Sequence, residues 1–133
     1  MALTLTIGCG RKPLSPEPVP VDRVECARCR MLISSQSGGG EIVASGEDTR
    51  FYDDVGCLAA DAASRPERSK VYVRLAGDTF VEAAAAFYAR PAGARTPMGS
   101  GLVAFRTADE ARAADPSGHV LGWNDVLQAK GEQ

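Results

Sequence analysis

Two short apolar runs, 41–44 and 49–52, are separated by the polar turn residues Gly-Glu-Asp in the first half of the chain. Runs of this length around such a turn are typical of a β-hairpin. In residues 55–65 the apolar side chains recur at the three- and four-residue spacing of a helix, and Pro66 can end it. Asp53 or Asp54 can cap the start of that helix. The first half therefore predicts strand, strand and helix.

The second half repeats short strands and helices. A period-two strand over 70–75 opens it, followed by a turn at Gly77-Asp78 and a short returning strand. Thr107 and Glu110 have the spacing of a capping box, which predicts a helix after them. The other expected elements are a helix over 82–90, closed by Pro91, a strand over 102–105, a strand over 119–122 and a helix over 123–130. Mixed short elements predict an α+β fold with two small ββαβ-type halves in one compact domain, preceded by an extended N-terminal tether.

Composition and charge remove several classes of function. The 133 residues suit one compact domain, and the net charge is −2. The 15 Lys and Arg residues are scattered along the chain, so no nucleic-acid partner is expected. No stretch approaches the roughly 18 apolar residues that a membrane-spanning helix needs.

The N-terminal residues indicate export and anchoring. Residues 1–8 are mostly small and apolar, and Thr6-Ile7-Gly8-Cys9 resembles the site at which bacterial lipoproteins are cleaved and acylated on cysteine. The four prolines in 10–22 exclude helix and favour an extended spacer. We therefore expect a truncated lipoprotein signal at 1–8, a tether at 9–22 and a folded domain at 23–133. The alternative is a frayed terminus with a stray cysteine at position 9.

The motif Cys26-Ala27-Arg28-Cys29-Arg30-Met31 carries the most chemistry in the sequence. Residues two apart on an extended backbone point to one side, so Cys29 and Met31 could face one ion. Thiolate and thioether together suit copper(I). The pair also fits half a zinc site, a disulfide, or a thiol–disulfide redox motif, with Met31 as core filler. Haem attachment is excluded, because Arg30 stands where that motif needs His.

A second candidate ligand is Met98, which lies in the Pro- and Gly-rich segment 91–101. It could bind a metal or cover the edge of the core. Cys57 falls on the apolar face of the predicted helix, where a small buried residue is the simpler interpretation. His119 has no second histidine as partner and is interpreted as structural or superficial.

Taken together, these motifs resemble the NosL family over most of residues 22–127. Neither Cys-x-x-Cys-x-Met nor Thr-Pro-Met-Gly is specific alone, but the two in this order and separation are fairly specific. The residues that carry the resemblance are Cys26-x-x-Cys29-x-Met31, Phe51-Tyr52-Asp53-Asp54, Gly56-Cys57, Val71-Tyr72-Val73, Thr96-Pro97-Met98-Gly99, Ala104-Phe105 and Gly118-x-Val120-Leu121.

The resemblance implies a copper(I)-binding lipoprotein on the outer face of a bacterial membrane. Such proteins are carriers, not enzymes, and help to mature the copper sites of nitrous oxide reductase during denitrification. They exchange copper with a receiving protein or a membrane transporter complex. Copper binding in the family maps onto Cys29, Met31 and Met98, with Cys26 as a further candidate. The chain departs from the family at Arg30, where Gly is usual, and in the Ser- and Gly-rich segment 34–40, which lacks a familiar His. The alternative is an extracytoplasmic thiol–disulfide protein that uses Cys26 and Cys29.

Overall fold

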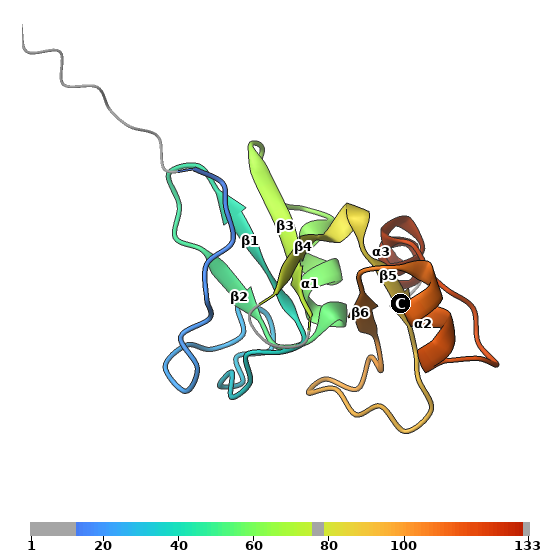
Figure 1. Cartoon of the computed structure of the whole chain (residues 1–133). Coiled ribbons are helices and arrows are strands. Elements are labelled where there is room, and N and C mark those ends of the chain that lie inside the picture. Colours follow the sequence, from blue (N-terminus) through green and yellow to red (C-terminus); the bar gives the residue numbers. More distant parts are fainter. Residues whose placement is uncertain (1–12, 76–78, 132–133) are drawn as a thin grey trace, which may run out of the picture.

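The chain folds around one continuous hydrophobic core to which both halves contribute. Figure 1 shows how its helices and strands are arranged. The computed structural model describes residues 13–75 and 79–131. Its elements are β1 (Gly40–Ala44), β2 (Arg50–Tyr52), α1 (Val55–Ala62), β3 (Ser69–Arg74), β4 (Phe80–Glu82), the 3-10 turn η1 (Ala83–Ala85), β5 (Phe87–Ala89), β6 (Val103–Phe105), α2 (Ala108–Ala114) and α3 (Trp123–Gly131). Mixed helices and sheets in a compact unit confirm the predicted α+β class.

Two antiparallel sheets carry the same connection pattern. The larger sheet has the strand order β2-β1-β3-β4, and α1 connects β2 to β3 across it. The smaller sheet pairs β5 with β6, and Leu121 returns after α2 to form a single bridge with Tyr88 of β5. Each half thus places its first strand between the second strand and the returning segment. This agreement confirms the ββαβ-type halves, although the returning strand of the second half is reduced to one residue pair.

Three sequence-based assignments were wrong. The strand predicted at 70–75 pairs with β1, so it completes the first half instead of opening the second. The helix predicted over 82–90 is replaced by the end of β4, a single 3-10 turn and β5. Local alanine propensity is weak compared with burial, and here Tyr88 is fully buried while its strand pairs with β6. The strand predicted at 119–122 is the one-residue bridge.

The predicted caps are present at the starts of α1 and α2. Asp54 caps α1 by accepting a hydrogen bond from the amide of Gly56 at 2.7 Å. Thr107 caps α2 by accepting one from Glu110 at 3.1 Å. These contacts satisfy amides that have no partner within the helix. The Asp54 cap also fixes the start of α1 directly after β2.

The part of the Pro-rich segment that the structure describes lies against the domain. Val19 is buried, and its carbonyl oxygen accepts a hydrogen bond from Gln36. The hydroxyl of Tyr72 donates to the carbonyl oxygen of Leu14 at 2.6 Å. The predicted signal, Cys9 and the turn at 77–78 lie outside the described residues.

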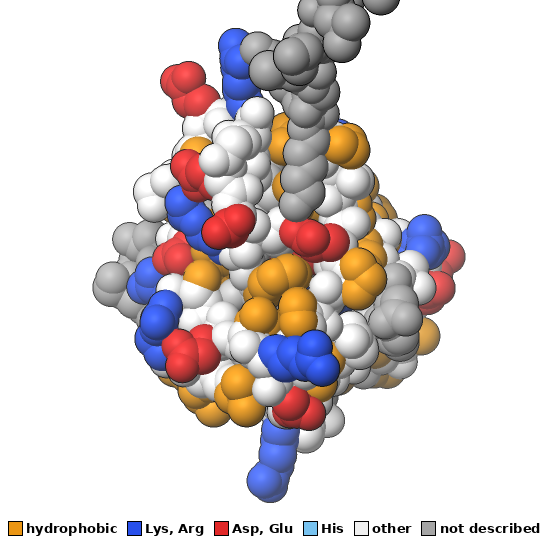
Figure 2. Space-filling model, turned by 90° about the vertical axis from the view of Figure 1, so that its left-hand side faces the viewer, with side chains coloured by type: hydrophobic (Ala, Val, Ile, Leu, Met, Phe, Trp, Pro, Cys, Tyr) orange, Lys and Arg blue, Asp and Glu red, His pale blue; other side chains and the backbone are white. Residues whose placement is uncertain are grey.

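The surface carries both signs of charge. On the face shown in Figure 2, basic, acidic and apolar side chains are interspersed among the described residues. This pattern agrees with the scattered Lys and Arg residues of the sequence. None of the helices in the described part of the chain has the length and apolar character needed to cross a membrane.

Candidate metal centre

The Cys-x-x-Cys segment folds into a tight turn. The amide of Cys26 donates to the carbonyl oxygen of Met31 at 2.8 Å, and the amide of Arg30 donates to that of Cys26 at 3.0 Å. Glu25 and Leu32 form an antiparallel bridge across the base of the turn. Arg30 takes a positive φ of 67°, which allows the chain to reverse between Cys29 and Met31. The close spacing in sequence thereby becomes two sulfur-bearing residues on one turn.

Two contacts anchor this turn to the larger sheet and α1. The amide of Ala27 donates to the carbonyl oxygen of Phe51 in β2 at 2.8 Å. The Arg28 side chain forms an ion pair with Asp61 of α1 at 2.7 Å, and the Tyr52 hydroxyl donates to the same carboxylate at 3.0 Å. The cysteine turn is therefore fixed to the strand and the helix that flank Asp53.

Four potential ligand atoms gather where these elements meet. The sulfurs of Cys26, Cys29 and Cys57 and a carboxylate oxygen of Asp53 all lie within 4.8 Å of one another. The thiol of Cys29 donates to Asp53 Oδ1 at 3.5 Å. All three cysteines are free, Cys26 and Cys57 are buried, and Cys29 is partly exposed. Three thiols and one carboxylate this close can hold a thiophilic metal ion without rearrangement of the backbone.

Burial keeps two of these thiols protonated at neutral pH. Removal from water raises the pKa of Cys29, and the hydrogen bond from the amide of Met31 only partly offsets this rise. Burial also raises the pKa of Cys57, and the neighbouring Cys26 and Cys29 add to the effect. A metal ion that binds here must displace protons, since thiolates are the binding form.

The Met98 loop is held next to this cluster by Asp54. Besides capping α1, the Asp54 carboxylate accepts the amide of Met98 at 2.9 Å. Burial alone would raise the pKa of Asp54, but hydrogen bonds from Ser100, Thr96, Gly56 and Met98 outweigh it and lower the pKa. A charged, buried carboxylate thus joins the first half of the chain to a loop of the second.

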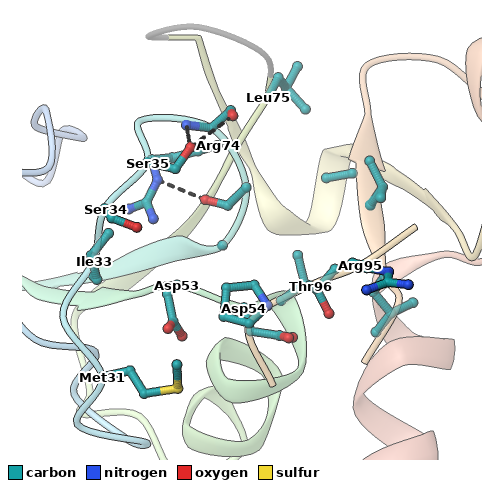
Figure 3. A pocket seen from close by; sticks show the side chains of 18 of the residues that line it. Met31, Ile33, Ser34, Ser35, Asp53, Asp54, Arg74, Leu75, Arg95 and Thr96 are labelled. Carbon is teal, nitrogen blue, oxygen red and sulfur yellow. Dashed lines mark hydrogen bonds between the residues drawn. The ribbon is translucent and has the colours of Figure 1, made fainter. Parts of the chain in front are cut away.

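A cavity of about 670 Å³ opens beside the cluster. The segment after the cysteine turn forms one wall, and Thr96 and Pro97 form part of the opposite wall. In Figure 3 the Met31 side chain and the Asp53 carboxylate point into the same part of this space. Met31 is 46% exposed and Met98 is 52% exposed, so both thioethers are accessible from solvent.

A buried arginine forms the far side of the cavity and fixes its shape. Arg74 of β3 donates through Nε to the carbonyl oxygen of Gly38 at 2.8 Å and through Nη2 to that of Tyr52 at 2.7 Å. These bonds tie the Gly-rich segment to the end of β2, immediately before Asp53. The position of the Asp53 carboxylate is therefore set by a contact across three strands.

The structure places the predicted site residues in two groups. Cys26 and Cys29 belong to the cluster, whereas Met31 is exposed where it lines the cavity and Met98 is exposed on the loop tied to Asp54. Cys57 belongs to the cluster as well, although the sequence pattern favoured a small core residue. Either Asp53 or Asp54 was expected to cap the helix, and Asp54 does so. His119 is exposed, in agreement with its expected superficial role.

Helical periodicity alone does not identify Asp53 and Cys57 as members of the cluster. Cys57 lies in the first turn of α1 and Asp53 just before its N-cap, and their ligand atoms lie within 4.8 Å of each other. Only the three-dimensional contact between α1 and the cysteine turn shows that these residues face Cys26 and Cys29.

Comparison with known proteins places the fold. The NosL family model matches residues 18–130. Among solved structures, the crystal structure of the copper chaperone NosL from Shewanella denitrificans is similar, with a TM-score of 0.65 and 20% sequence identity. The similarity covers 89% of this chain and 99% of that chain. No curated protein matches the chain.

Proposed function

Because this chain belongs to the NosL family, we propose that it is a copper(I) carrier that acts outside the cytoplasm, and not an enzyme. The single observation that carries this proposal is the convergence of three free thiols and a carboxylate next to a cavity lined by the exposed thioether of Met31. Soft sulfur donors match a soft monovalent ion, and Met is a poor ligand for zinc. The solved protein of similar fold is a copper chaperone, which supports the same cargo.

Our proposed ligand set contains Cys29, Met31 and Met98, with Cys26 as a further donor. Cys29 is the partly exposed thiol of the cluster, and the hydrogen bond from the amide of Met31 offsets part of the rise that burial causes in its pKa. Met31 follows on the same turn. Met98 is held nearby through the bond between its amide and Asp54. The sulfur of Cys57 and a carboxylate oxygen of Asp53 belong to the same cluster and would lie close enough to contact the ion.

Exposure on one side and burial on the other suit a carrier. The buried thiols can hold the ion, while the exposed thioethers leave a path along which a partner's donor can approach. Ligands can then be exchanged one at a time, so the ion never needs to be released into water. The proposed receiver is a cuproprotein, such as nitrous oxide reductase, or a membrane transporter complex.

We also propose that the carrier is lipid-anchored through Cys9. Residues 1–8 would be the signal, 9–22 the tether and 23–133 the copper-binding domain. A lipidated protein would lie in the periplasm or on the outer face of the membrane. Mass spectrometry of the protein extracted from membranes tests this part: an acylated Cys9 supports it, and an unmodified Cys9 in that fraction refutes it.

Anaerobic titration with copper(I) in competition with a coloured chelator tests the cargo. The reduced chain should bind one ion, and Cys29→Ser should weaken binding about a hundredfold, or ~2.7 kcal/mol. His119→Ala is the matched control and should bind like the parent. Equal affinities of Cys29→Ser and the parent would refute the ligand assignment.

A thiol–disulfide protein is the competing function, and the closeness of the three thiols is in its favour. A catalytic thiol of that class needs a lowered pKa to attack its partner. Burial instead raises the pKa of Cys29. The carrier therefore has the stronger support.

A further inference from the structure

The cluster holds more thiols than one copper(I) ion with two thioether ligands needs, which raises the question of what the extra thiols do. Copper(I) is commonly satisfied by few soft donors, and here three thiols lie within 4.8 Å of one another, with the exposed Met31 on the same turn as two of them. Free thiols kept this close outside the cytoplasm are exposed to conditions in which disulfides form and persist. Two neighbouring thiols can therefore react with each other in place of binding the ion.

Resting on the proposed carrier function, we propose that Cys29 and Cys26 form a reversible disulfide that excludes copper from the site. Cys29 is the thiol that reacts first, because it is partly exposed while the other two cysteines are buried. Cys26 is the resolving thiol, since it lies three residues away on the same turn and its sulfur is within 4.8 Å. Cys57 remains a thiol.

The turn has the geometry for this bond. The sulfurs must approach from within 4.8 Å to the separation of about 2.05 Å that a disulfide has. The contacts of Cys26 and Arg30 hold the two residues on one reversal of the backbone, so side-chain rotation brings the sulfurs together. Cys57, by contrast, is fixed on α1 by the cap of that helix. A bond to Cys57 would have to join the turn to a helix held by separate contacts.

Oxidation needs a second disulfide as acceptor of two electrons, and we name oxidised glutathione as the test compound. The Cys29 thiolate attacks one glutathione sulfur, forms a mixed disulfide and releases one glutathione thiolate. The Cys26 thiolate then attacks the Cys29 sulfur and releases the second glutathione. The protein loses two protons and two electrons, and oxidised glutathione becomes two reduced molecules.

The disulfide and the ion compete for the same sulfur. Once bonded to Cys26, Cys29 has no thiolate to offer, and its contact with Asp53 is lost as well. The exposed thioethers alone bind copper(I) weakly, because neither carries charge. The carrier would then load copper only after a reductant has opened the bond, which makes loading dependent on the redox state outside the membrane.

The experiment uses the full chain with Cys9→Ser, so that only the three cluster thiols are counted. The reduced, metal-free protein is incubated with oxidised glutathione, then denatured and labelled with a maleimide, and the disulfide is mapped by peptide mass spectrometry. Two of three thiols should be lost, with a peptide joining Cys26 to Cys29. Cys57→Ala is the matched control and should form the same bond. Three reactive thiols, a persistent glutathione adduct or a bond to Cys57 would each overturn the proposal.

Copper titration of the same samples separates the two hypotheses. The oxidised protein should bind copper(I) at least about a hundredfold more weakly than the reduced protein, and dithiothreitol should restore binding. Unchanged affinity in the disulfide form would overturn exclusion while leaving the carrier intact. A reduced protein that fails to bind copper would instead refute the carrier, and thiol counting would still decide whether the bond forms.

Discussion

The two halves of the molecule share a connection pattern but use it differently. The first half buries two of its three thiols: those of Cys26 and Cys57 are buried, and α1 packs against the sheet. The second half contributes Met98 from an exposed loop, held to the first half through the buried carboxylate of Asp54. A rigid half beside an accessible one is what a carrier requires, since one must retain the ion and the other must let it leave.

Backbone packing should show the largest difference between the halves. Gly39 and Gly99 both have positive φ, 64° and 71°. A Cβ at Gly39 would overlap the carbonyl oxygen of Tyr52, whereas one at Gly99 meets open space among the described residues. Gly39→Ala should therefore lower the free energy of unfolding by about 3 kcal/mol beyond the loss in Gly99→Ala, which carries only the backbone strain. Urea unfolding of both variants measures this, and equal losses would contradict the rigid first half.

The connection between the halves should show the next largest effect. Asp54→Asn leaves one oxygen for the two amides of Gly56 and Met98, so a buried, charge-assisted hydrogen bond is lost. We expect a loss of about 2 kcal/mol in unfolding free energy, together with weaker copper binding.

Asp125→Asn is the matched control for this change, because Asp125 also accepts an amide, that of Gly122, but in an exposed position. It should change the unfolding free energy by less than about 0.5 kcal/mol. Similar losses in the two variants would mean that Asp54 acts as an ordinary cap and not as the link to the Met98 loop.

A change in the accessible second half should alter copper(I) affinity without altering the stability of the fold. Met98→Leu keeps the volume and the exposed position of the side chain but removes the thioether, so the unfolding free energy should stay within about 0.5 kcal/mol of the parent. Copper(I) affinity should fall about tenfold, or ~1.4 kcal/mol. Chelator competition measures the copper(I) affinity, and urea unfolding of the same preparation measures the stability. Unchanged affinity would remove Met98 from the ligand set.

Local signals predicted short-range features better than the pairing of distant segments. The hairpin, the α1 cap at Asp54 and the capping box at Thr107 were visible because each depends on residues close in sequence. The stretch 82–90 was wrong for the opposite reason. Its alanines favour a helix locally, but the burial of Tyr88 and its pairing with β6 are decided by residues far along the chain.

The candidate site, like the fold, could be predicted only where its residues are close in sequence. The Cys-x-x-Cys-x-Met spacing identified Cys26, Cys29 and Met31 as neighbours, because one turn contains them all. The roles of Asp53 and Cys57 could not be seen, since they depend on how α1 packs against that turn. A sequence pattern reports which side of a helix is buried, but not which side chains it meets there.

The smallest expected change in unfolding free energy concerns the cysteine turn of the first half, where Arg30 has a strained backbone conformation. Arg30 has a φ of 67°, a conformation that costs a residue with a side chain about 1–2 kcal/mol and glycine almost nothing. Arg30→Gly removes that strain but adds freedom to the unfolded chain, which offsets about 0.4–1 kcal/mol. The exposed ion pair with Glu25 contributes little. The net expectation is a gain of about 0.5 kcal/mol in unfolding free energy.

Arg28→Gly on the same turn is the matched control, because Arg28 is an arginine outside the positive-φ region whose loss also breaks the ion pair with Asp61. It should lower the unfolding free energy, while Arg30→Gly raises it and leaves copper(I) affinity unchanged. If both variants lost stability alike, the turn would be held by its arginine side chains. If Arg30→Gly alone weakened copper binding, the strained backbone would itself be holding Cys29 and Met31 in register, and the rigidity of the first half would extend to the ligands.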